Sequence, residues 1–199
     1  MPDEHLFLAS NHISWIDILA LGGATGAAFV AHDGVGKWPI IGWLAAQNNT
    51  ILVARSDRRG VGGQVDALRA AIAGHQPLLL FPEGTTNDGR ALLPFKPALF
   101  AVLTPPPRDL LIQPVHIDYG PAAPAVAWFG AEPALANVRR VLARKGPLDI
   151  TIRLLEPFSP SDFADRKAVA AEARRRIEAS MAQYAEAPAA ASAPPFAIV

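Results

Sequence analysis

The sequence contains no cysteine among its 199 residues, which excludes both a disulfide framework and a thiolate metal site. Equal numbers of basic and acidic side chains, 18 of each, give a formal net charge of zero, so the basic excess typical of nucleic-acid binding is absent. No apolar run reaches the roughly 18 residues that a membrane-spanning helix needs. Residues 1–5 do not place a basic region before an apolar one, so they do not predict a signal peptide.

What the chain does contain predicts one α/β domain. Hydrophobic residues make up 51% of it, enough for a sizeable core, and its length fits a single domain. Strands are expected at residues 6–9, 27–31, 50–54, 77–81, 110–117, 126–129 and 148–155. Helices are expected at residues 15–21, 38–46, 65–73, 98–103, 135–145 and 164–184, the last opened by Ser161 and Asp162. This alternation predicts a mixed, largely parallel sheet flanked by helices.

The composition of the chain changes near its C-terminal end. The predicted domain covers residues 1–186. Residues 187–199 are mostly Ala, Pro and Ser, a composition that predicts a disordered tail.

Two polar blocks follow two of the predicted strands. His12 and Asp17 come just after the apolar run 6–9, and the block 81–86 comes directly after the apolar run 78–80. Open α/β sheets build their sites where the ends of such strands meet at one edge. A His with an Asp partner is the minimal set for general-base catalysis, because the Asp holds the imidazole in one tautomer.

The spacing of His12 and Asp17 restricts the local backbone. Residues five apart on a regular helix point away from each other, so the two side chains can meet only if His12 precedes the helix that contains Asp17. Asn11 or Ser14 could cap that helix.

Four motifs occur in an order that resembles one known family. They are N-H-x-S-x-x-D at residues 11–17, a region at 37–42 and 51–55, F-P-E-G-T-T at 81–86, and a strand with a proline at 111–115. Together they resemble the glycerophospholipid acyltransferases, which include the bacterial 1-acyl-glycerol-3-phosphate acyltransferases. The resemblance runs along residues 6–157 and implies a glycerolphosphate-acyltransferase-like fold.

The resemblance implies transfer of a fatty acyl chain from acyl-CoA or acyl carrier protein to the hydroxyl of a lysophospholipid, 1-acyl-glycerol-3-phosphate. His12 would take the proton of the acceptor hydroxyl, and Asp17 would orient His12. Neither a metal nor a tightly bound cofactor is implied.

The resemblance also implies an acceptor head-group site in the block 81–86. Its members would be Glu83, Gly84, Thr85 and Thr86, and the alternative role for Glu83 is a salt bridge that pins the turn.

Basic residues are further candidates for this site. Lys37, Arg55 and Lys96 could meet an anionic group, because arginine and lysine both bind phosphates. Each could instead be an ordinary surface charge.

Thr86 departs from the family pattern. Many members that act on lysophosphatidate carry arginine there, and threonine supplies a hydroxyl but no charge. Lyso-ornithine lipid O-acyltransferases resemble this chain around residues 81–89, so their acceptor is the alternative to lysophosphatidate.

A membrane surface is the expected third partner. Family members usually carry a membrane-binding helical segment before the first motif, which begins here at residue 11. The apolar stretch 38–44, with Trp38 and Trp43, is either an acyl-groove or membrane-interface patch or a helix packed on the sheet. The resemblance implies peripheral association with the cytoplasmic side of the inner membrane, without a transmembrane helix in this chain.

Three other functions compete with this interpretation. A metallohydrolase would need His12, Asp17, His116 and Asp118 to form one ligand set. A serine hydrolase would need a G-x-S-x-G elbow, which the sequence lacks. A non-catalytic module that binds acyl-CoA or lipid would not need both His12 and Asp17.

Overall fold

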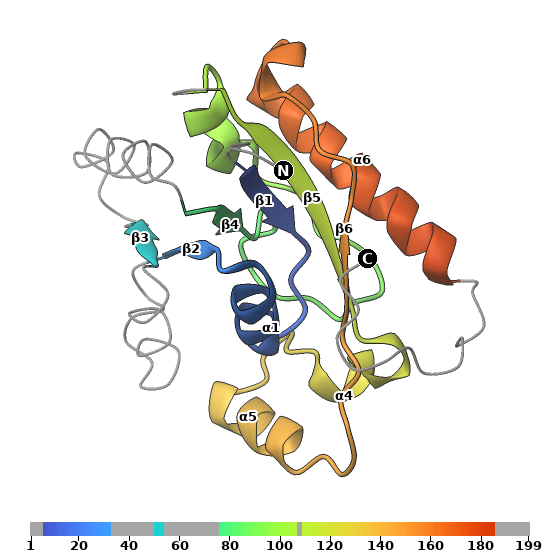
Figure 1. Ribbon diagram of the computed structural model, residues 1–199. Helices are drawn as coiled ribbons and strands as arrows, with labels where there is room; N and C mark the ends of the chain where they lie inside the picture. The colour runs from blue at the N-terminus through green and yellow to red at the C-terminus, as the bar shows by residue number, and fades with distance from the viewer. Residues whose placement is uncertain (1–5, 33–49, 54–75, 107–108, 186–199) are drawn as a thin grey trace.

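A computed structural model describes residues 6–32, 50–53, 76–106 and 109–185, which fold around a six-stranded sheet (Figure 1). Its order is β3-β2-β4-β1-β5-β6. All neighbours pair in parallel except β6, which is antiparallel to β5. The strands are β1 (Leu6–Ser10), β2 (Ala28–His32), β3 (Ile51–Val53), β4 (Leu78–Leu80), β5 (Leu111–Asp118) and β6 (Thr151–Leu154). The predicted mixed, largely parallel sheet is confirmed.

Strand β1 lies inside the sheet and is buried on both faces, which explains why its sequence is an unbroken apolar run. Phe7 of β1 pairs with Leu78 of β4 on one side and with Ile112 of β5 on the other. This register brings the loops after β1, β4 and β5 to one edge of the sheet.

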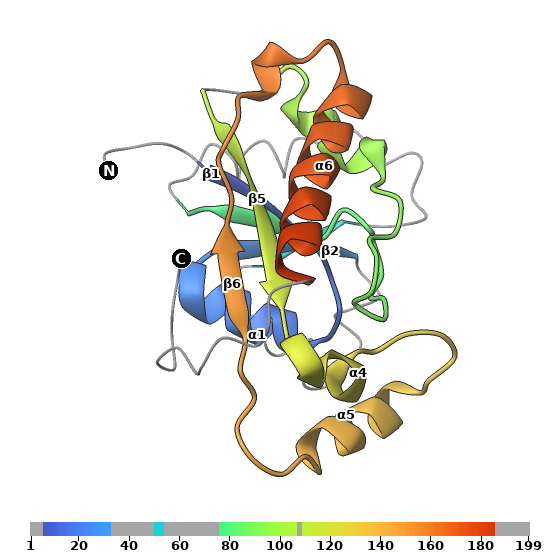
Figure 2. The same cartoon turned by 90° about the vertical axis from the view of Figure 1, so that its right-hand side faces the viewer.

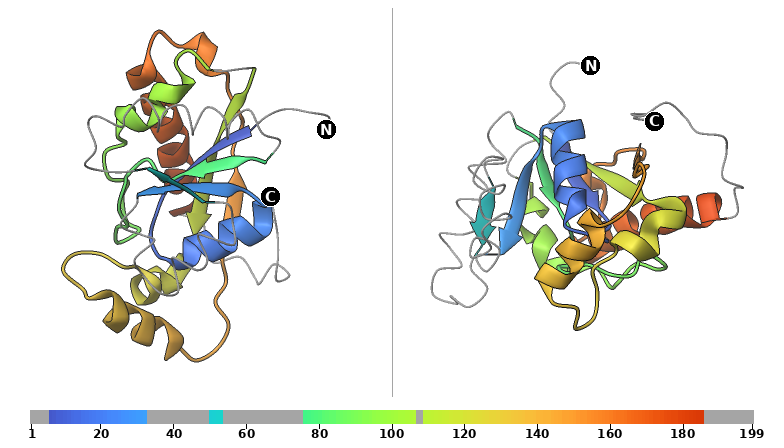
Figure 3. Two further views of the ribbon diagram at one scale, coloured as in Figure 1. Left: turned by 90° about the vertical axis from the view of Figure 1, so that its left-hand side faces the viewer. Right: turned by 90° about the horizontal axis from the view of Figure 1, so that it is seen from below.

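Helices cover both faces of the sheet (Figures 2 and 3). One face packs on α6 (Arg166–Ala185) and the 3₁₀-helix η2 (Pro97–Leu103). The other face packs on α1 (Ile16–Thr25), α4 (Ala123–Val126) and α5 (Ala134–Leu142). Short 3₁₀-helices, η3 (Gly120–Ala122) and η4 (Pro160–Asp162), precede α4 and α6.

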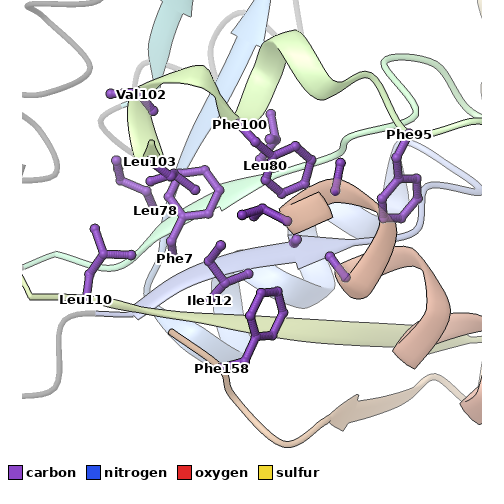
Figure 4. Close-up of a cluster of buried hydrophobic side chains, with 14 of the residues drawn as sticks. Phe7, Leu78, Leu80, Phe95, Phe100, Val102, Leu103, Leu110, Ile112 and Phe158 are labelled. Atoms are coloured by element: carbon purple, nitrogen blue, oxygen red, sulfur yellow. The ribbon is translucent and has the colours of Figure 1, made fainter. Parts of the chain in front are cut away.

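Each face therefore has its own hydrophobic core, because alternate strand residues point to opposite sides. The core under α6 is shown in Figure 4. It contains, among others, Phe7, Leu78, Leu80, Phe100, Ile112 and Ile177. The core under α1 contains, among others, Leu8, Leu21, Leu79, Val115, Ile117 and Val126.

The strand predicted at residues 126–129 is wrong. Helix α4 ends there, and Val126 is fully buried in the second core. Pro124 sits in the first turn of α4, where its fixed φ favours a helix. A short apolar run cannot by periodicity alone be told from a buried helix segment.

The predicted start of the last helix is also wrong. Asp165 caps α6, since its Oδ1 accepts hydrogen bonds from the backbone N–H groups of Lys167 and Ala168. Ser161 and Asp162 lie in the 3₁₀-helix η4 instead, which Ser159 caps. The helix predicted at 98–103 is a 3₁₀-helix. Helix α1 continues past residue 21 to Thr25 and is capped by Gly26, whose φ is 64°.

Several predictions fall on other parts of the chain. The helices at 38–46 and 65–73, the stretch 38–44 and the tail 187–199 lie outside the described residues. Among the helices that are described, none combines the length and the apolar character needed to cross a bilayer.

Candidate active site

His12 lies in the loop between β1 and α1, and Asp17 lies in the first turn of α1. His12 Nδ1 and Asp17 Oδ2 are 2.8 Å apart. Asp17 is completely buried, whereas the His12 side chain keeps 15% of its surface exposed. The expected turn between the two residues is confirmed. It places a buried carboxylate behind a histidine whose edge is accessible.

The carboxylate of Asp17 also organises the loop before the helix. Its Oδ2 accepts hydrogen bonds from the backbone N–H groups of Ile13 at 2.7 Å and Ser14 at 3.0 Å. These bonds satisfy two backbone amides of the loop that precedes α1. The predicted cap by Asn11 is wrong, whereas Ser14 Oγ accepts from the backbone N–H of Ile16, the first residue of α1, at 3.5 Å.

Asn11 joins the site to β5 instead. Its Nδ2 donates to the Ile117 carbonyl at 3.0 Å, and its Oδ1 accepts from the Ile117 N–H at 2.9 Å. The side chain thus behaves like one more backbone pair between β1 and β5. It fixes the direction in which the chain leaves β1.

Tyr119 is a member of the site that sequence reasoning missed. Its hydroxyl donates a hydrogen bond to Asp17 Oδ1, and its side chain is almost completely buried. Burial, followed by the charge of Asp17 and the hydrogen bond to it, raises the pKa of Tyr119, so the hydroxyl stays protonated as a donor. The available signal was its place directly after β5, the neighbour of β1.

Glu83 holds the backbone of His12 from the other side. Its Oε1 accepts from the His12 N–H at 2.9 Å, and its Oε2 accepts from the Leu93 N–H at 2.8 Å and from the Asn87 side chain. Burial raises the pKa of Glu83, and these hydrogen bonds partly offset that effect. Amide donors thus stand in place of the salt bridge considered for Glu83. Its contact with a head group stays a prediction.

The imidazole of His12 is also held by an aromatic ring. Its plane stacks on Phe81, with the ring centres 3.9 Å apart and the planes at 14°. The stack and the bond from Nδ1 together fix the orientation of the ring. Among the described residues, none forms a hydrogen bond with Nε2, so this nitrogen is the one that can face a substrate.

The block 81–86 brings Lys96 close to the site. Gly84 has φ 71°, and a Cβ built on it would lie 2.4 Å from Lys96 Nζ, so the glycine makes room for the lysine. Thr85 is exposed and Thr86 is half-buried. Lys37 and Arg55 lie outside the described residues, so their head-group role stays a prediction.

The ligand set required for a metallohydrolase is not assembled. His116 Nδ1 lies 2.9 Å from Ser180 Oγ, and Asp118 pairs with Arg153 at 3.0 Å. Across residues 6–32, 50–53, 76–106 and 109–185, no cluster of three His, Cys, Asp or Glu side chains could hold a metal ion.

Comparison with known proteins gives consistent matches. A family model described as Acyltransferase matches residues 1–118. The lyso-ornithine lipid O-acyltransferase of Rhodobacter capsulatus is 35% identical over 191 residues, which cover 92% of this chain and 68% of that protein. Three further proteins of that name match over 86–90% of this chain. The chain thus spans about two thirds of the length of these relatives.

Two further matches differ in extent. The 1-acyl-sn-glycerol-3-phosphate acyltransferase of Neisseria gonorrhoeae is 34% identical over 95 residues, 48% of this chain and 37% of that protein. The crystal structure of the 1-acyl-sn-glycerophosphate acyltransferase of Thermotoga maritima superposes with a TM-score of 0.65. That superposition covers 95% of this chain and 70% of the other at 21% identity, which shows a shared fold. With the family model and the Rhodobacter relative together, the chain belongs to the Acyltransferase family.

Proposed function

We propose that this protein transfers a fatty acyl chain from a thioester to the hydroxyl of lyso-ornithine lipid. The observation that carries the reaction is the hydrogen bond between His12 Nδ1 and the buried Asp17. No described residue forms a hydrogen bond with His12 Nε2, so this nitrogen can accept a proton from a substrate. The extent of similarity supports the acceptor: it covers 86–92% of the chain for the lyso-ornithine lipid enzymes but 48% for the Neisseria enzyme.

In the proposed reaction, His12 Nε2 takes the proton of the acceptor hydroxyl while the hydroxyl oxygen attacks the thioester carbonyl carbon. Asp17 keeps the proton of the neutral ring on Nδ1 and stabilises the imidazolium that forms. The tetrahedral intermediate then collapses, the carbon–sulfur bond breaks, and the proton passes from His12 to the departing sulfur. The products are an ester and a free thiol, and no covalent acyl-enzyme is needed.

The acyl donor belongs to the proposal as either acyl-CoA or acyl carrier protein. We also propose that no metal or tightly bound cofactor takes part, since the reacting hydroxyl and thioester need only a base and oxyanion donors. The site of action proposed from the family resemblance is the cytoplasmic face of the inner membrane, with peripheral attachment.

Lysophosphatidate is the second candidate acceptor. Lys96 places a cation beside the block 81–86, where a phosphate monoester would be bound. Thr86 argues against it, because its side chain adds no charge at the position where many lysophosphatidate enzymes carry arginine.

The decisive experiment supplies the purified protein with labelled acyl-CoA or acyl carrier protein and either lysolipid. We expect free thiol and acylated lyso-ornithine lipid, and we expect a metal chelator to leave their formation unaffected.

His12→Ala should lower turnover by about 10²–10⁴ while the protein stays folded, because general-base catalysis contributes a factor of that size to the rate. Asp17→Asn should be severely impaired as well. Thioester binding without release of thiol would instead establish a non-catalytic module.

A second variant tests the acceptor. Thr86→Arg should improve turnover of lysophosphatidate if a phosphate binds beside Thr86, because a charged hydrogen bond contributes about 1.5–3 kcal/mol. With lyso-ornithine lipid as the natural acceptor, the same variant should gain nothing or be inhibited on it. A wild-type enzyme that prefers lysophosphatidate would overturn the proposed acceptor and leave the reaction class standing.

A further inference from the structure

Helix α5 exposes large apolar side chains to solvent. Leu135 and Leu142 are 62% and 72% exposed, and they lie seven residues apart, on one side of the helix. Phe129, in the turn before α5, is 52% exposed. Single exposed leucines are ordinary, but three large exposed apolar residues within the segment 129–142 point to an interaction surface.

Two exposed basic residues lie within or just after this segment of the chain. Arg139 lies four residues after Leu135 and three before Leu142, so it shares their side of α5. Arg139 and Lys145 are exposed, and no ion pair is formed by either with any described residue. We call Phe129, Leu135, Arg139, Leu142 and Lys145 the α5 surface.

The acidic residue of this segment is already neutralised. Glu132 pairs with Arg140 at 2.8 Å, and Arg140 also donates to the Ala125 and Ala127 carbonyls. The net charge that the segment presents to a partner is therefore positive.

The opposite side of α5 is fixed to the loop that carries His12. Asn137 is fully buried, and its Oδ1 accepts from Trp15 Nε1 at 3.1 Å. The backbone N–H of Trp128 donates to the Ile13 carbonyl at 2.9 Å. The exposed leucines therefore belong to a helix whose inner side is packed, and a partner bound there would be held in a fixed position relative to the active site.

We propose that the α5 surface docks on an anionic phospholipid bilayer. Leucine and phenylalanine would enter the boundary between head groups and acyl chains, and the cations would meet the lipid phosphates. A second copy of this chain fits less well, because a symmetric contact would bring the same cations together. This docking rests on the proposed function in that the acceptor is a lipid. Its test measures vesicle binding without turnover, so it can fail or succeed independently of the proposed reaction.

The position of α5 agrees with this docking. In Figures 1 and 2, α5 lies at the end of the molecule toward which β1 and β5 point, beyond α1 and α4. His12 follows β1 at that same end. A bilayer on the α5 surface would thus hold a lipid acceptor near the histidine.

The test measures sedimentation of the full chain with vesicles of equal parts phosphatidylglycerol and phosphatidylcholine. We expect the wild type to bind, and to bind less at high salt because ions screen the cations. The double variant Leu135→Gln, Leu142→Gln should bind at least about tenfold more weakly, since two apolar side chains no longer leave water. Leu135→Met, Leu142→Met is the matched control and should bind normally. Leu, Gln and Met have similar helix propensities, so α5 is preserved in both.

A second pair isolates the charges and also serves if the glutamine pair fails to fold, which thermal unfolding would reveal. Arg139→Gln, Lys145→Gln should weaken binding to these vesicles and remove much of its salt dependence. Equal binding by this pair and the wild type would overturn the proposal, as would a wild type that does not sediment. If the methionine pair lost as much binding as the glutamine pair, the contact would depend on the exact shape of the side chains, as in a protein interface. That result would also overturn the proposal. The proposal would also be overturned if the glutamine pair converted a dimeric wild type to a monomer while its binding to vesicles stayed unaltered.

Discussion

Asp17 has both carboxylate oxygens engaged by four groups of the chain. Oδ2 accepts from His12 Nδ1 and from the backbone of Ile13 and Ser14, and Oδ1 accepts from the Tyr119 hydroxyl. A buried carboxylate needs such donors, because its charge is otherwise costly to remove from water. The same side chain therefore stabilises the loop before α1 and orients the histidine, so the loss of any of these donors should affect His12.

Tyr119→Phe tests this arrangement at the residue scale. Removing the hydroxyl leaves Oδ1 without the donor seen in the structure, at a cost of about 1–3 kcal/mol for a buried acceptor. We expect kcat to fall about ten- to a hundredfold at unchanged KM for the thioester, measured by release of thiol. Tyr184→Phe, on the partly exposed Tyr184 of α6, is the control and should keep wild-type kcat. A folded Tyr119→Phe enzyme with normal kcat would show that Asp17 does not need this donor.

At the scale of elements, β5 carries a buried polar contact to α6 on the face remote from α1. His116 of β5 is buried, and its Nδ1 lies 2.9 Å from Ser180 Oγ of α6. Desolvation by burial lowers the pKa of His116 to about 4, with Asp118 opposing this shift and Arg153 adding to it. The histidine is thus neutral in the folded protein at neutral pH, and it joins strand to helix without a charge.

The pH dependence of stability should reveal this histidine. Below its ordinary pKa of 6.5, His116 is protonated in the unfolded chain but stays neutral in the folded chain down to about pH 4. The unfolded state therefore binds more protons in this window, so stability falls as pH drops through it, by about 3 kcal/mol at most. Urea unfolding of the wild type and of His116→Gln at pH 7 and pH 4.5 measures the difference. Equal pH dependence in both proteins would contradict the assignment.

Some contacts between these elements can be predicted from the sequence, and others cannot. The apolar runs of β1 and β4 and the polar blocks after them predicted the sheet edge at which His12 and Glu83 meet. The contact of Tyr119 with Asp17 was missed because no spacing rule links positions 102 apart. It depends on the register of β1 with β5. The strand predicted at 126–129 failed because a short apolar run carries too little periodicity to exclude a helix.

At the scale of the whole molecule, the sheet divides the hydrophobic core into two clusters with different neighbours. Ile13, Ile16 and Tyr119 belong to the cluster under α1, beside the candidate active site. Ile177 of α6 belongs to the cluster on the other face, with Phe7 and Ile112. Packing defects in the two layers should therefore affect catalysis differently, even where they cost the same stability.

Ile177→Ala and Leu21→Ala form a matched pair for this comparison. Both side chains are completely buried, one in α6 and one in α1, so each truncation should lower the free energy of unfolding by about 2–5 kcal/mol. The Leu21 variant should also lower kcat, because α1 carries Asp17 and a cavity beneath it lets the His12 loop move. The Ile177 variant should keep kcat in its folded fraction, since the sheet lies between the defect and the site. Urea unfolding gives the first quantity, and initial rates well below the unfolding midpoint give the second. Equal loss of kcat in both variants would mean that the two layers act as one rigid body, and that the site depends on the packing of the entire sheet.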